Sequence, residues 1–177
     1  FSGTDGKELF GYIPGSVFSK LPALTALTFE HKFFVDSTPM VGDIQKSDST
    51  WGTVLVGGLG AGGKGYYALD ITSQSTFATA TESTLSTTLP LWAFTETQDT
   101  DLGFTFNEAA LDPVYGANVQ IAKVADSTTA SGAWRVIVGN GFGSTAGRAA
   151  LLMLDANTGV ASTKLIADNV GPNNGLA

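Results

Sequence analysis

The chain has 177 residues, the length of one domain, and its formal net charge of −7 disfavours nucleic acids and anionic membranes, which attract basic surfaces. The lack of Cys and the single His exclude disulfide frameworks and the common zinc sites. With 22 Gly and 14% charged residues, the composition favours a turn-rich, all-β fold over a helical bundle.

The first 35 residues precede the clearest pattern in the chain. Residues 8–14 combine Leu, Phe, Tyr and Ile with a closing Pro, and we predict one strand there. Residues 15–30 are expected to hold one short helix. Residues 32–35 predict another strand, with His31 capping it or packing at its start. No run of roughly 18 apolar residues occurs in the sequence, so membrane insertion is not expected.

An internal repeat follows these elements. Residues 51–60 and 134–143 each begin with Trp, continue as an apolar, Val-rich strand and end in a Gly-rich turn. Residues 66–72 and 151–159 then give both copies an apolar strand that ends in Leu-Asp. The two Trp and the two Asp recur at nearly the same spacing, and self-similarity of this kind indicates a repeat architecture.

Each copy of the repeat completes a set of four strands. Residues 39–44 and 113–121 supply a strand before the Trp, and residues 91–94 and 164–167 supply one after the Leu-Asp strand. Four short strands joined by Gly, Asp and Asn turns are typical of one blade of a β-propeller. We therefore predict an all-β, partial β-propeller with about two four-stranded antiparallel blades, a strand of a third, long loops and one short helix. The predicted divisions of this one propeller fragment, 1–177, are the outer strand of a preceding blade at 1–14, a blade at 30–95 and a blade at 96–170.

A polar segment interrupts the first copy. Residues 72–88 are mostly Ser and Thr, a composition that contributes little to a packed core. We predict that this segment is a mobile loop, dispensable for folding, and that limited proteolysis cuts it first.

The glycines of the two turns allow a second interpretation. Residues 58–63 match G-x-G-x-x-G and, with Lys64, nearly match a P-loop, although Gly65 stands where Mg²⁺ binding requires Ser or Thr. A dinucleotide site also needs a helix after the glycines, whereas residues 66–69 predict a strand. Because both copies repeat the pattern, we interpret it as backbone geometry. The predicted turn residues are Gly57, Gly58, Gly60, Gly63, Asp70, Gly139, Gly141, Gly143, Asp155 and Gly159.

Two Asp-containing segments resemble the start of a calcium loop. Residues 155–159 and 99–103 have the spacing of early ligands, but Ile166 and Ala110 occupy the twelfth position, where a bidentate Glu is needed. Asx turns are therefore favoured at both segments. A Ser-His-Asp triad would have to use His31, and no G-x-S-x-G elbow occurs, so we assign no catalytic, cofactor-binding or metal-binding residue.

The three tryptophans are predicted to pack between blades. Trp51 and Trp134 occupy equivalent positions of the repeat, and Trp92 lies in the fourth strand of the first copy. Large aromatic side chains at such positions bury much apolar area. The alternative is that these rings form a platform for stacking on a sugar.

Three blocks of sequence carry a family resemblance. Residues 8–14, 31–39 and 51–70, in their order and spacing, closely resemble the C-terminal domain of the PilC/PilY-type tip adhesins and assembly proteins of type IV pili. Residues 134–177 are similar but less distinctive, and residues 72–88 show no resemblance. The resemblance implies a section of a modified seven-bladed propeller.

The resemblance also implies a function. It points to pilus extension against retraction, twitching motility and adhesion to surfaces or host cells, with minor pilins as partners and a host-cell or abiotic surface as a further one. It implies an exported protein at the outer membrane surface or pilus tip of a Gram-negative bacterium. The regulatory calcium site of the family lies beyond Ala177, so no cofactor is expected in this fragment.

Two kinds of function remain open from the sequence. A non-catalytic binding and assembly module fits the repeat and the family blocks. A quinoprotein dehydrogenase propeller, of the type that binds pyrroloquinoline quinone, is the enzymatic alternative, because residues 154–159 resemble turns of its blades. A carbohydrate-binding propeller that uses Trp92 or Trp51 is the third hypothesis.

Overall fold

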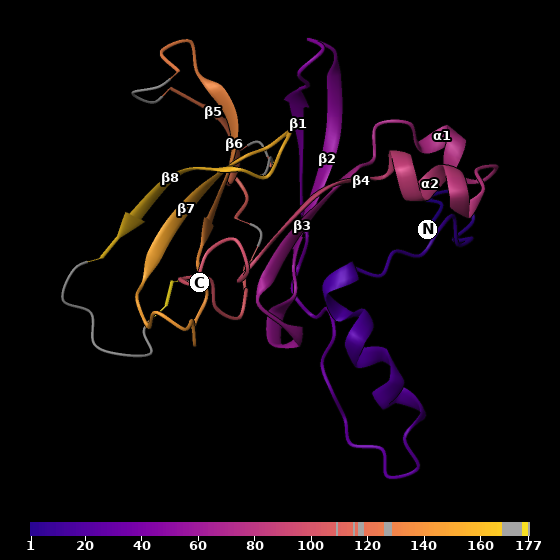
Figure 1. Ribbon diagram of the computed structural model, residues 1–177. Helices are drawn as coiled ribbons and strands as arrows, with labels where there is room; N and C mark the ends of the chain where they lie inside the picture. The colour runs from indigo at the N-terminus through magenta and orange to yellow at the C-terminus, as the bar shows by residue number, and fades with distance from the viewer. Residues whose placement is uncertain (109, 115, 117–118, 126–128, 168–174, 177) are drawn as a thin grey trace.

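Two four-stranded antiparallel sheets dominate the computed structural model, which describes residues 1–108, 110–114, 116, 119–125, 129–167 and 175–176 (Figure 1). Within each sheet the strands follow chain order from one edge to the other, which confirms the predicted all-β propeller section. The first sheet contains β1 (Met40–Gln45), β2 (Trp51–Gly58), β3 (Gly65–Asp70) and β4 (Pro90–Thr95). The second contains β5 (Ile121–Val124), β6 (Ala133–Gly139), β7 (Ala150–Asp155) and β8 (Ala161–Ile166).

The two sheets share local details as well as topology. Val56 pairs with Ala68 in the first sheet, and Val138 pairs with Leu152 in the second. Each sheet also has a register shift in its outer strand pair immediately before the Leu-Asp sequence. A bulge of this kind increases the local twist of a strand. The repeat in the sequence therefore corresponds to one unit of structure built twice.

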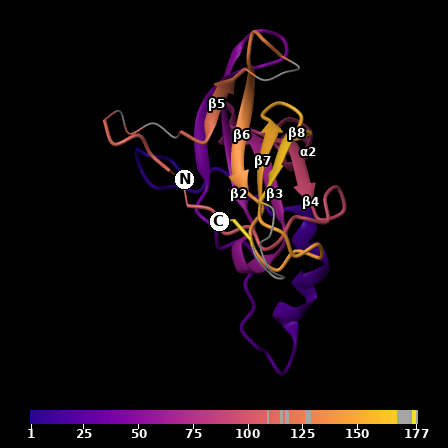
Figure 2. The ribbon, with the colours of Figure 1, turned by 90° about the vertical axis from the view of Figure 1, so that its left-hand side faces the viewer.

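The main core lies between the sheets, which Figure 2 shows one in front of the other. Alternate residues of each strand point into this space because successive side chains of a strand face opposite sides. The fully buried members from the first sheet include Ile44, Val54, Val56 and Tyr66, and those from the second include Val136, Val138, Leu152 and Leu154.

Two close contacts fix how the sheets meet. The Tyr66 hydroxyl donates a 2.9 Å hydrogen bond to the Gly139 carbonyl oxygen, so the core tyrosine keeps a partner for its polar end. Where β1 approaches β5, a Cβ added to Gly42 would lie 3.0 Å from Ile121 Cβ. Gly42 thus allows the first strands of the two sheets to come together.

The opposite face of the first sheet has its own cover. Leu69, Phe77 and Leu89 form a second core with partly buried residues of the N-terminal segment. Phe77 ends α1 (Gln74–Phe77), and α2 (Glu82–Thr88) follows it. The prediction of a loop at residues 72–88 was therefore wrong, because two short helices form there, while its mobility and early proteolysis stay predictions. Thr81 caps α2 by accepting a hydrogen bond from the Thr84 amide, a local signal that the low-complexity composition obscures.

The N-terminal segment also differs from the prediction. Residues 1–14 contain no strand, and residues 32–35 contain none either. A strand needs a neighbour for its hydrogen-bond ladder, whereas residues 8–14 use their side chains instead: the Phe10 ring lies 4.9 Å from the Phe77 ring and the Tyr12 ring 5.4 Å from the Tyr67 ring. The segment covers a sheet face without adding a strand.

A short helix follows this segment, as expected for residues 15–30. It is a 3₁₀ helix, η1 (Gly15–Thr25), which contains Pro22. Proline cannot donate the amide hydrogen bond of a regular α-helix. The Lys20 ammonium donates a hydrogen bond to the Gly62 carbonyl oxygen, which ties η1 to the first sheet. Among the helices of the described residues, none is long and apolar enough to cross a membrane.

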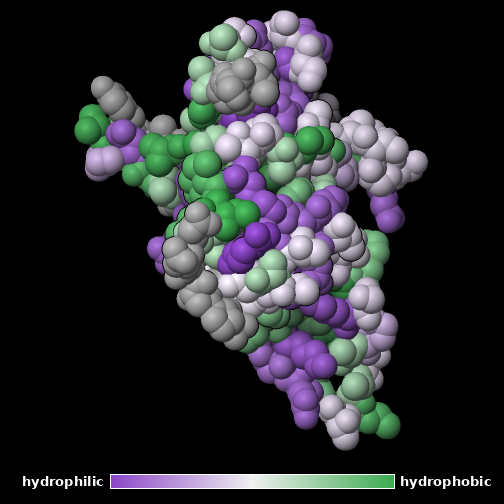
Figure 3. Space-filling view, turned by 60° about the vertical axis from the view of Figure 1, so that its left-hand side comes forward, coloured by the Kyte–Doolittle hydropathy of each residue, from purple (hydrophilic) through white to green (hydrophobic). Residues whose placement is uncertain are grey.

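The second sheet carries no comparable cover on its other face within the described chain. Leu165 in β8 is 55% exposed, and Leu151 of the neighbouring β7 is only partly buried. Figure 3, in which this side of the molecule comes forward, shows apolar side chains gathered in patches between polar ones.

Candidate functional site at the junction of the two sheets

The Gly-rich turn of the first sheet is crossed by two other backbone segments. It runs from β2 through a single 3₁₀ turn, η2 (Gly60–Gly62), to β3. A Cβ on Gly58 would lie 2.5 Å from the Thr105 carbonyl oxygen, and a Cβ on Gly62 would lie 1.8 Å from the Phe34 carbonyl oxygen. Real Cβ atoms do not approach backbone so closely, so the glycines make room for these crossings.

Thr105 holds this turn at both ends. Its buried hydroxyl accepts a 2.9 Å hydrogen bond from the Leu59 amide and donates a 2.7 Å bond to the Gly65 carbonyl oxygen. The Gly60 amide donates to the Thr105 carbonyl oxygen at 3.2 Å. Thr105 belongs to the segment between the two sheets, so this linker is fastened to the first turn.

The turn of the second sheet receives the same linker. The Gly103 amide donates to the Asn140 carbonyl oxygen at 2.7 Å, and a Cβ on Gly141 would lie 1.9 Å from the Phe104 carbonyl oxygen. Gly141 has φ +69°, a backbone conformation that residues other than glycine rarely adopt. Its amide donates to the Leu176 carbonyl oxygen at 2.8 Å. Both turns therefore serve as docking points for passing backbone.

The Asn140 side chain organises the second turn. It is fully buried, and its Oδ1 accepts hydrogen bonds from the amides of Ala150 and Leu176 at 2.8 and 3.1 Å. Its Nδ2 donates to the carbonyl oxygens of Asp101 and Arg148 at 2.6 and 2.7 Å. A buried amide with all its hydrogen-bonding capacity used rigidifies the chain around it.

The predicted turn glycines divide into two groups. Gly60, Gly141, Gly143 and Gly159 have positive φ, as a tight turn requires. The turn assignment was wrong for three others, because Gly57, Gly58 and Gly139 lie within strands β2 and β6. Gly63 has an extended φ of 167°, which any residue adopts.

Space explains the glycines that lie in extended backbone. A Cβ on Gly57 would lie 2.4 Å from the ring of Tyr67, its partner across β2 and β3. After η2 the chain continues as strand β3, as predicted from residues 66–69. The G-x-G-x-x-G pattern therefore lacks the helix whose N-terminus would hold a pyrophosphate.

A cluster of charges lies beside the second turn. The fully buried Asp101 side chain binds Arg148 through two hydrogen bonds, Nε to Oδ1 at 2.8 Å and Nη2 to Oδ2 at 2.7 Å. The Lys164 ammonium lies 2.7 Å from Asp101 Oδ2 and 2.8 Å from Asp99 Oδ2. The cluster thus joins the linker to strand β8 and to the loop before β7.

The charge of Asp101 is strongly favoured in the folded protein. Burial raises the pKa of its carboxyl, but the hydrogen bonds and positive charges of Arg148 and Lys164 outweigh burial, so the pKa lies below its usual range. Burial lowers the pKa of the Lys164 ammonium, but its hydrogen bonds to Asp101 and Asp99 and their negative charges outweigh burial and raise it. Residues 99–103 therefore form an ion cluster, with both carboxylates already paired.

The two predicted Asp turns are built alike. Asp70 Oδ1 accepts hydrogen bonds from the Thr72 amide and hydroxyl, while its Oδ2 binds Lys46 at 2.6 Å. Asp155 Oδ1 accepts hydrogen bonds from the amides of Asn157 and Thr158 at 3.1 Å. Its Oδ2 pairs with Arg135 at 2.6 Å. Both are Asx turns braced by a basic side chain.

The tryptophans have different surroundings. Trp92 is 8% exposed, and its Nε1 donates a 2.9 Å hydrogen bond to the Ala156 carbonyl oxygen in the other sheet. Trp51 is 63% exposed and meets Trp134 edge to face at 5.6 Å. Trp92 and Trp134 therefore pack in the core between the sheets, as predicted, whereas Trp51 is mostly exposed beside it, and Trp92 has no face free for a sugar.

The residues that carry most of this junction were not identified from the sequence. Thr105 lies in a segment with no motif, and Asn140 and Asp101 lie in segments that were interpreted as a glycine turn and an Asx turn. One signal was present: Asn140 replaces, in the second copy of the repeat, the Gly58 of the first. A polar residue at a repeated glycine position indicates a side chain with a local task.

Taken with the sheet topology, the junction defines a class of protein. A linker leaves the outermost strand of one four-stranded sheet and enters the first strand of the next, and the sheets pack face to face. This is the arrangement of consecutive blades in a β-propeller.

The family follows from comparison with known proteins. The family model of the PilY1 beta-propeller domain matches residues 1–177, and the chain belongs to this family. The PilC/PilY-type resemblance drawn from residues 8–14, 31–39 and 51–70 is thereby confirmed.

Individual relatives cover nearly the whole chain. The type IV pilus biogenesis factor PilY1 of Pseudomonas aeruginosa (strain UCBPP-PA14) is 36% identical over 176 residues, which are 97% of this chain and 13% of that protein. A PilY1 homolog of Xylella fastidiosa (strain Temecula1) is 34% identical over 94% of this chain and 10% of its own length. The crystal structure of the P. aeruginosa PilY1 C-terminal domain matches with a TM-score of 0.69 and 33% identity, covering 97% of this chain and 29% of that one. The chain thus spans a small part of the relatives it matches.

Proposed function

We propose that the chain is a non-catalytic binding and assembly module of a type IV pilus system, which supports pilus biogenesis, twitching motility and adhesion. The relatives described above are named as type IV pilus biogenesis factors. The observation that carries the proposal is the junction itself. Its glycines make room for backbone, and its buried carboxylate is paired with Arg148 and Lys164.

The proposal includes partners and location. A rigid pair of blades presents loops and sheet edges in fixed positions, which suits a scaffold for minor pilins and for a host-cell or abiotic surface. Such partners require an exported protein at the outer membrane surface or the pilus tip. We infer these features from membership of the PilY1 family.

The quinoprotein alternative loses the feature that favoured it, and the carbohydrate alternative loses Trp92, one of its two tryptophans. The turn at Asp155, which suggested a quinoprotein blade, lies against the first sheet: a Cβ on Gly159 would be 2.6 Å from the Trp92 ring. Trp92 itself is buried and hydrogen-bonded, so it offers no stacking platform. We therefore retain the assembly module.

The test uses a chromosomal variant in the bacterium that carries this gene. Gly141→Val should unfold the junction, because the new side chain meets the Phe104 backbone. We expect loss of surface pili, measured as pilin sheared from cells, and of the twitching zone. Gly116→Val is the control, because Gly116 also has a positive φ but no described residue lies within 4 Å of where its Cβ would be. Normal pili and twitching in a strain whose variant protein is unfolded would reject the proposal.

A further inference from the structure

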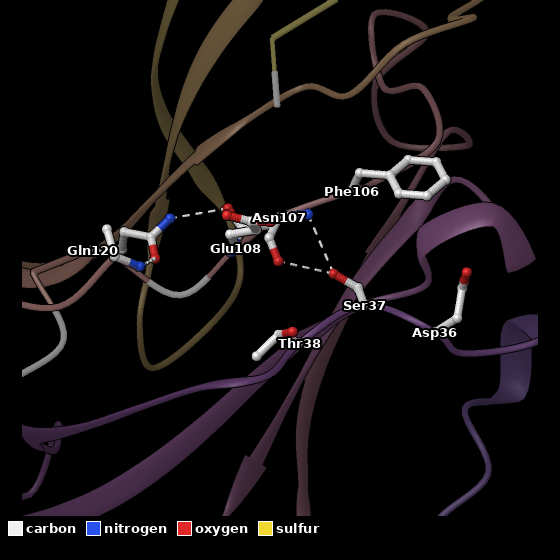
Figure 4. A pocket seen from close by; sticks show the side chains of 8 residues that line it. Asp36, Ser37, Thr38, Phe106, Asn107, Glu108 and Gln120 are labelled. Atoms are coloured by element: carbon white, nitrogen blue, oxygen red, sulfur yellow. Dashed lines mark hydrogen bonds between the residues drawn. The ribbon is translucent and has the colours of Figure 1, made fainter.

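A polar cleft lies between the two segments of chain that lead into the first strand of each sheet. It has a volume of about 530 Å³ and is bounded by the segment before β1 and by the linker before β5 (Figure 4). Its lining residues are Asp36, Ser37, Thr38, Phe106, Asn107, Glu108, Ala110 and Gln120. The Asp36 amide donates to the Leu59 carbonyl oxygen at 3.5 Å, so the cleft borders the first glycine turn, but the proposed assembly role does not use it.

The cleft is held in shape by hydrogen bonds between distant parts of the chain. The Ser37 hydroxyl donates to the Asn107 carbonyl oxygen at 3.0 Å, and the Asn107 amide donates back to Ser37 Oγ at 3.2 Å. Gln120 Nε2 donates to Asn107 Oδ1 at 2.9 Å. Figure 4 shows Asn107 between Gln120 and Ser37, with Gln120 bonded to its side chain and Ser37 to its backbone.

One hydrogen-bond donor in the cleft is unused. Asn107 is only 5% exposed, and its Nδ2 has no hydrogen-bond partner among the residues that the structure describes. A buried N–H group without an acceptor costs free energy, and native proteins rarely leave one. An oxygen atom of a bound molecule would remove this cost.

The remaining lining adds acceptors and an apolar wall. Asp36 and Glu108 are exposed carboxylates, and the eight lining residues include no Lys, Arg or His. The Phe106 ring stacks on Phe142, with ring centres 5.3 Å apart and planes 18° apart. Anions are disfavoured by the two carboxylates, whereas a bare cation would leave Asn107 Nδ2 without an acceptor.

We propose that this cleft binds a neutral saccharide. Each sugar hydroxyl both donates and accepts hydrogen bonds, so the carboxylates of Asp36 and Glu108 accept hydrogen bonds from hydroxyl groups while Asn107 Nδ2 donates to a hydroxyl oxygen. The apolar face of the sugar ring lies against Phe106. The proposal rests on the adhesive role proposed above and names its chemical class of ligand.

The test measures binding to the purified protein by NMR titration. The neutral probes are methyl β-galactoside, methyl α-mannoside and N-acetylglucosamine, the anionic probe is N-acetylneuraminic acid, and the cationic probe is spermidine. We expect at least one neutral sugar to shift the amide resonances of Ser37, Asn107 and Gln120, and we expect neither charged probe to do so. EDTA should leave neutral-sugar binding unchanged, because the proposed contacts need no metal ion.

Two variants test the named contacts. Asn107→Asp removes the unused donor but keeps the oxygen that accepts from Gln120, and Glu108→Gln removes a charged acceptor at the exposed rim. Each should weaken sugar binding by about tenfold, the effect of one hydrogen bond to a charged group. Glu30→Gln, an exposed change outside the cleft, is the matched control and should bind normally.

Several outcomes would overturn the inference. These are no shift with any neutral sugar, binding of spermidine or N-acetylneuraminic acid alone, loss of sugar binding in EDTA, or full binding by Glu108→Gln. Glu108→Gln tests the proposed site even if Asn107→Asp fails to fold, because Glu108 is exposed and its replacement is expected to leave the fold intact. Failure here together with loss of pili in the Gly141→Val strain would reject the saccharide site and leave the assembly role standing.

Discussion

The first and second sheets have the same topology but different covers. In the first, residues 71–89 connect β3 to β4 and form α1 and α2, which bury Phe77 and Leu89 against the sheet. In the second, residues 156–160 connect β7 to β8 directly, and Leu165 stays 55% exposed. A repeated strand pattern therefore determines the shared core between the sheets, while the length of one connection determines what covers an outer face.

The two glycine turns differ in a similar way. In the first, the hydroxyl of Thr105 from the linker bonds Leu59 and Gly65. In the second, the Asn140 amide within the turn bonds Ala150 and the linker. In both sheets a side chain holds the linker to the turn, but it comes from the linker in the first sheet and from the turn in the second. A comparison of the two repeats by residue identity alone therefore does not detect this shared contact.

The largest expected effect on stability comes from adding a side chain at Gly141, where the linker backbone crosses the second turn. Gly141→Ala should destabilise the protein by about 4 kcal/mol, the sum of about 1 for positive φ and about 3 for the clash with Phe104 backbone. Gly116→Ala has the same kind of φ but open space, so it should cost only about 1 kcal/mol. Chemical denaturation of both variants measures the difference, and equal costs would mean that space at Gly141 is unimportant.

The next effect tests the unequal covers. Phe77→Ala removes a buried ring from the covered face of the first sheet and should cost about 3 kcal/mol. Leu165→Ala removes an exposed side chain from the second sheet and should cost less than about 0.5 kcal/mol. Thermal unfolding of the two variants checks this order. A loss of stability in Leu165→Ala as large as in Phe77→Ala would show that the outer face of β8 is covered in solution.

The ion cluster gives a pH-dependent prediction. Asp101→Asn should cost about 2 kcal/mol at neutral pH, because Arg148 and Lys164 lose a charged, buried acceptor. The pKa of Asp101 is lowered on folding, so its charge stabilises the protein above the ordinary carboxyl pKa of about 3.9. This stability is lost as the pH falls through the folded-state pKa.

The difference between wild type and Asp101→Asn should therefore shrink in acid. Unfolding free energies at neutral pH and at pH below about 3.9 measure it. Asp43→Asn is the control, since Asp43 is exposed and accepts a hydrogen bond from the neutral hydroxyl of Thr53. A difference between wild type and Asp101→Asn that does not change with pH would contradict the assigned ion cluster.

The smallest effect distinguishes the tryptophans. Trp92→Phe keeps an aromatic ring but loses the hydrogen bond to Ala156, which should cost about 1 kcal/mol. Trp51→Phe keeps the edge contact with Trp134 at an exposed position and should cost less than about 0.5 kcal/mol. Denaturant titrations of both variants measure the two changes in the free energy of unfolding. A reversed order would mean that the exposed ring, and not the buried one, holds the sheets together.

Periodicity and turn residues predicted the sheets because these are local signals. The Trp, the Val-rich strand and the Leu-Asp strand of each copy correspond to β2, β3, β6 and β7. The positive φ values at Gly60 and Gly141 follow from their places in tight turns. The positions of Gly57 and Gly58 within β2 were missed, because a glycine that makes room looks the same in sequence as one that turns the chain.

Features that depend on distant contacts were not predictable from one sequence. Residues 8–14 have a strand-like pattern, yet they cover a sheet face because no described strand lies beside them. Residues 72–88 show no pattern in the sequence, yet Thr81 caps a helix there, and the Phe77 ring contacts the ring of Phe10 in the N-terminal segment. The ion cluster unites Asp101 with Lys164, 63 positions away, and no local pattern marks such a pair.

Amide hydrogen exchange tests most directly whether one linker is fastened to both glycine turns. We predict that the amides of Gly60 and Gly103, which join the linker to the two turns by donating to Thr105 and Asn140, exchange as slowly as those of strands β2 and β6. Rapid exchange at these glycines, beside protected strands, would show two independent sheets with free turns and would contradict the account.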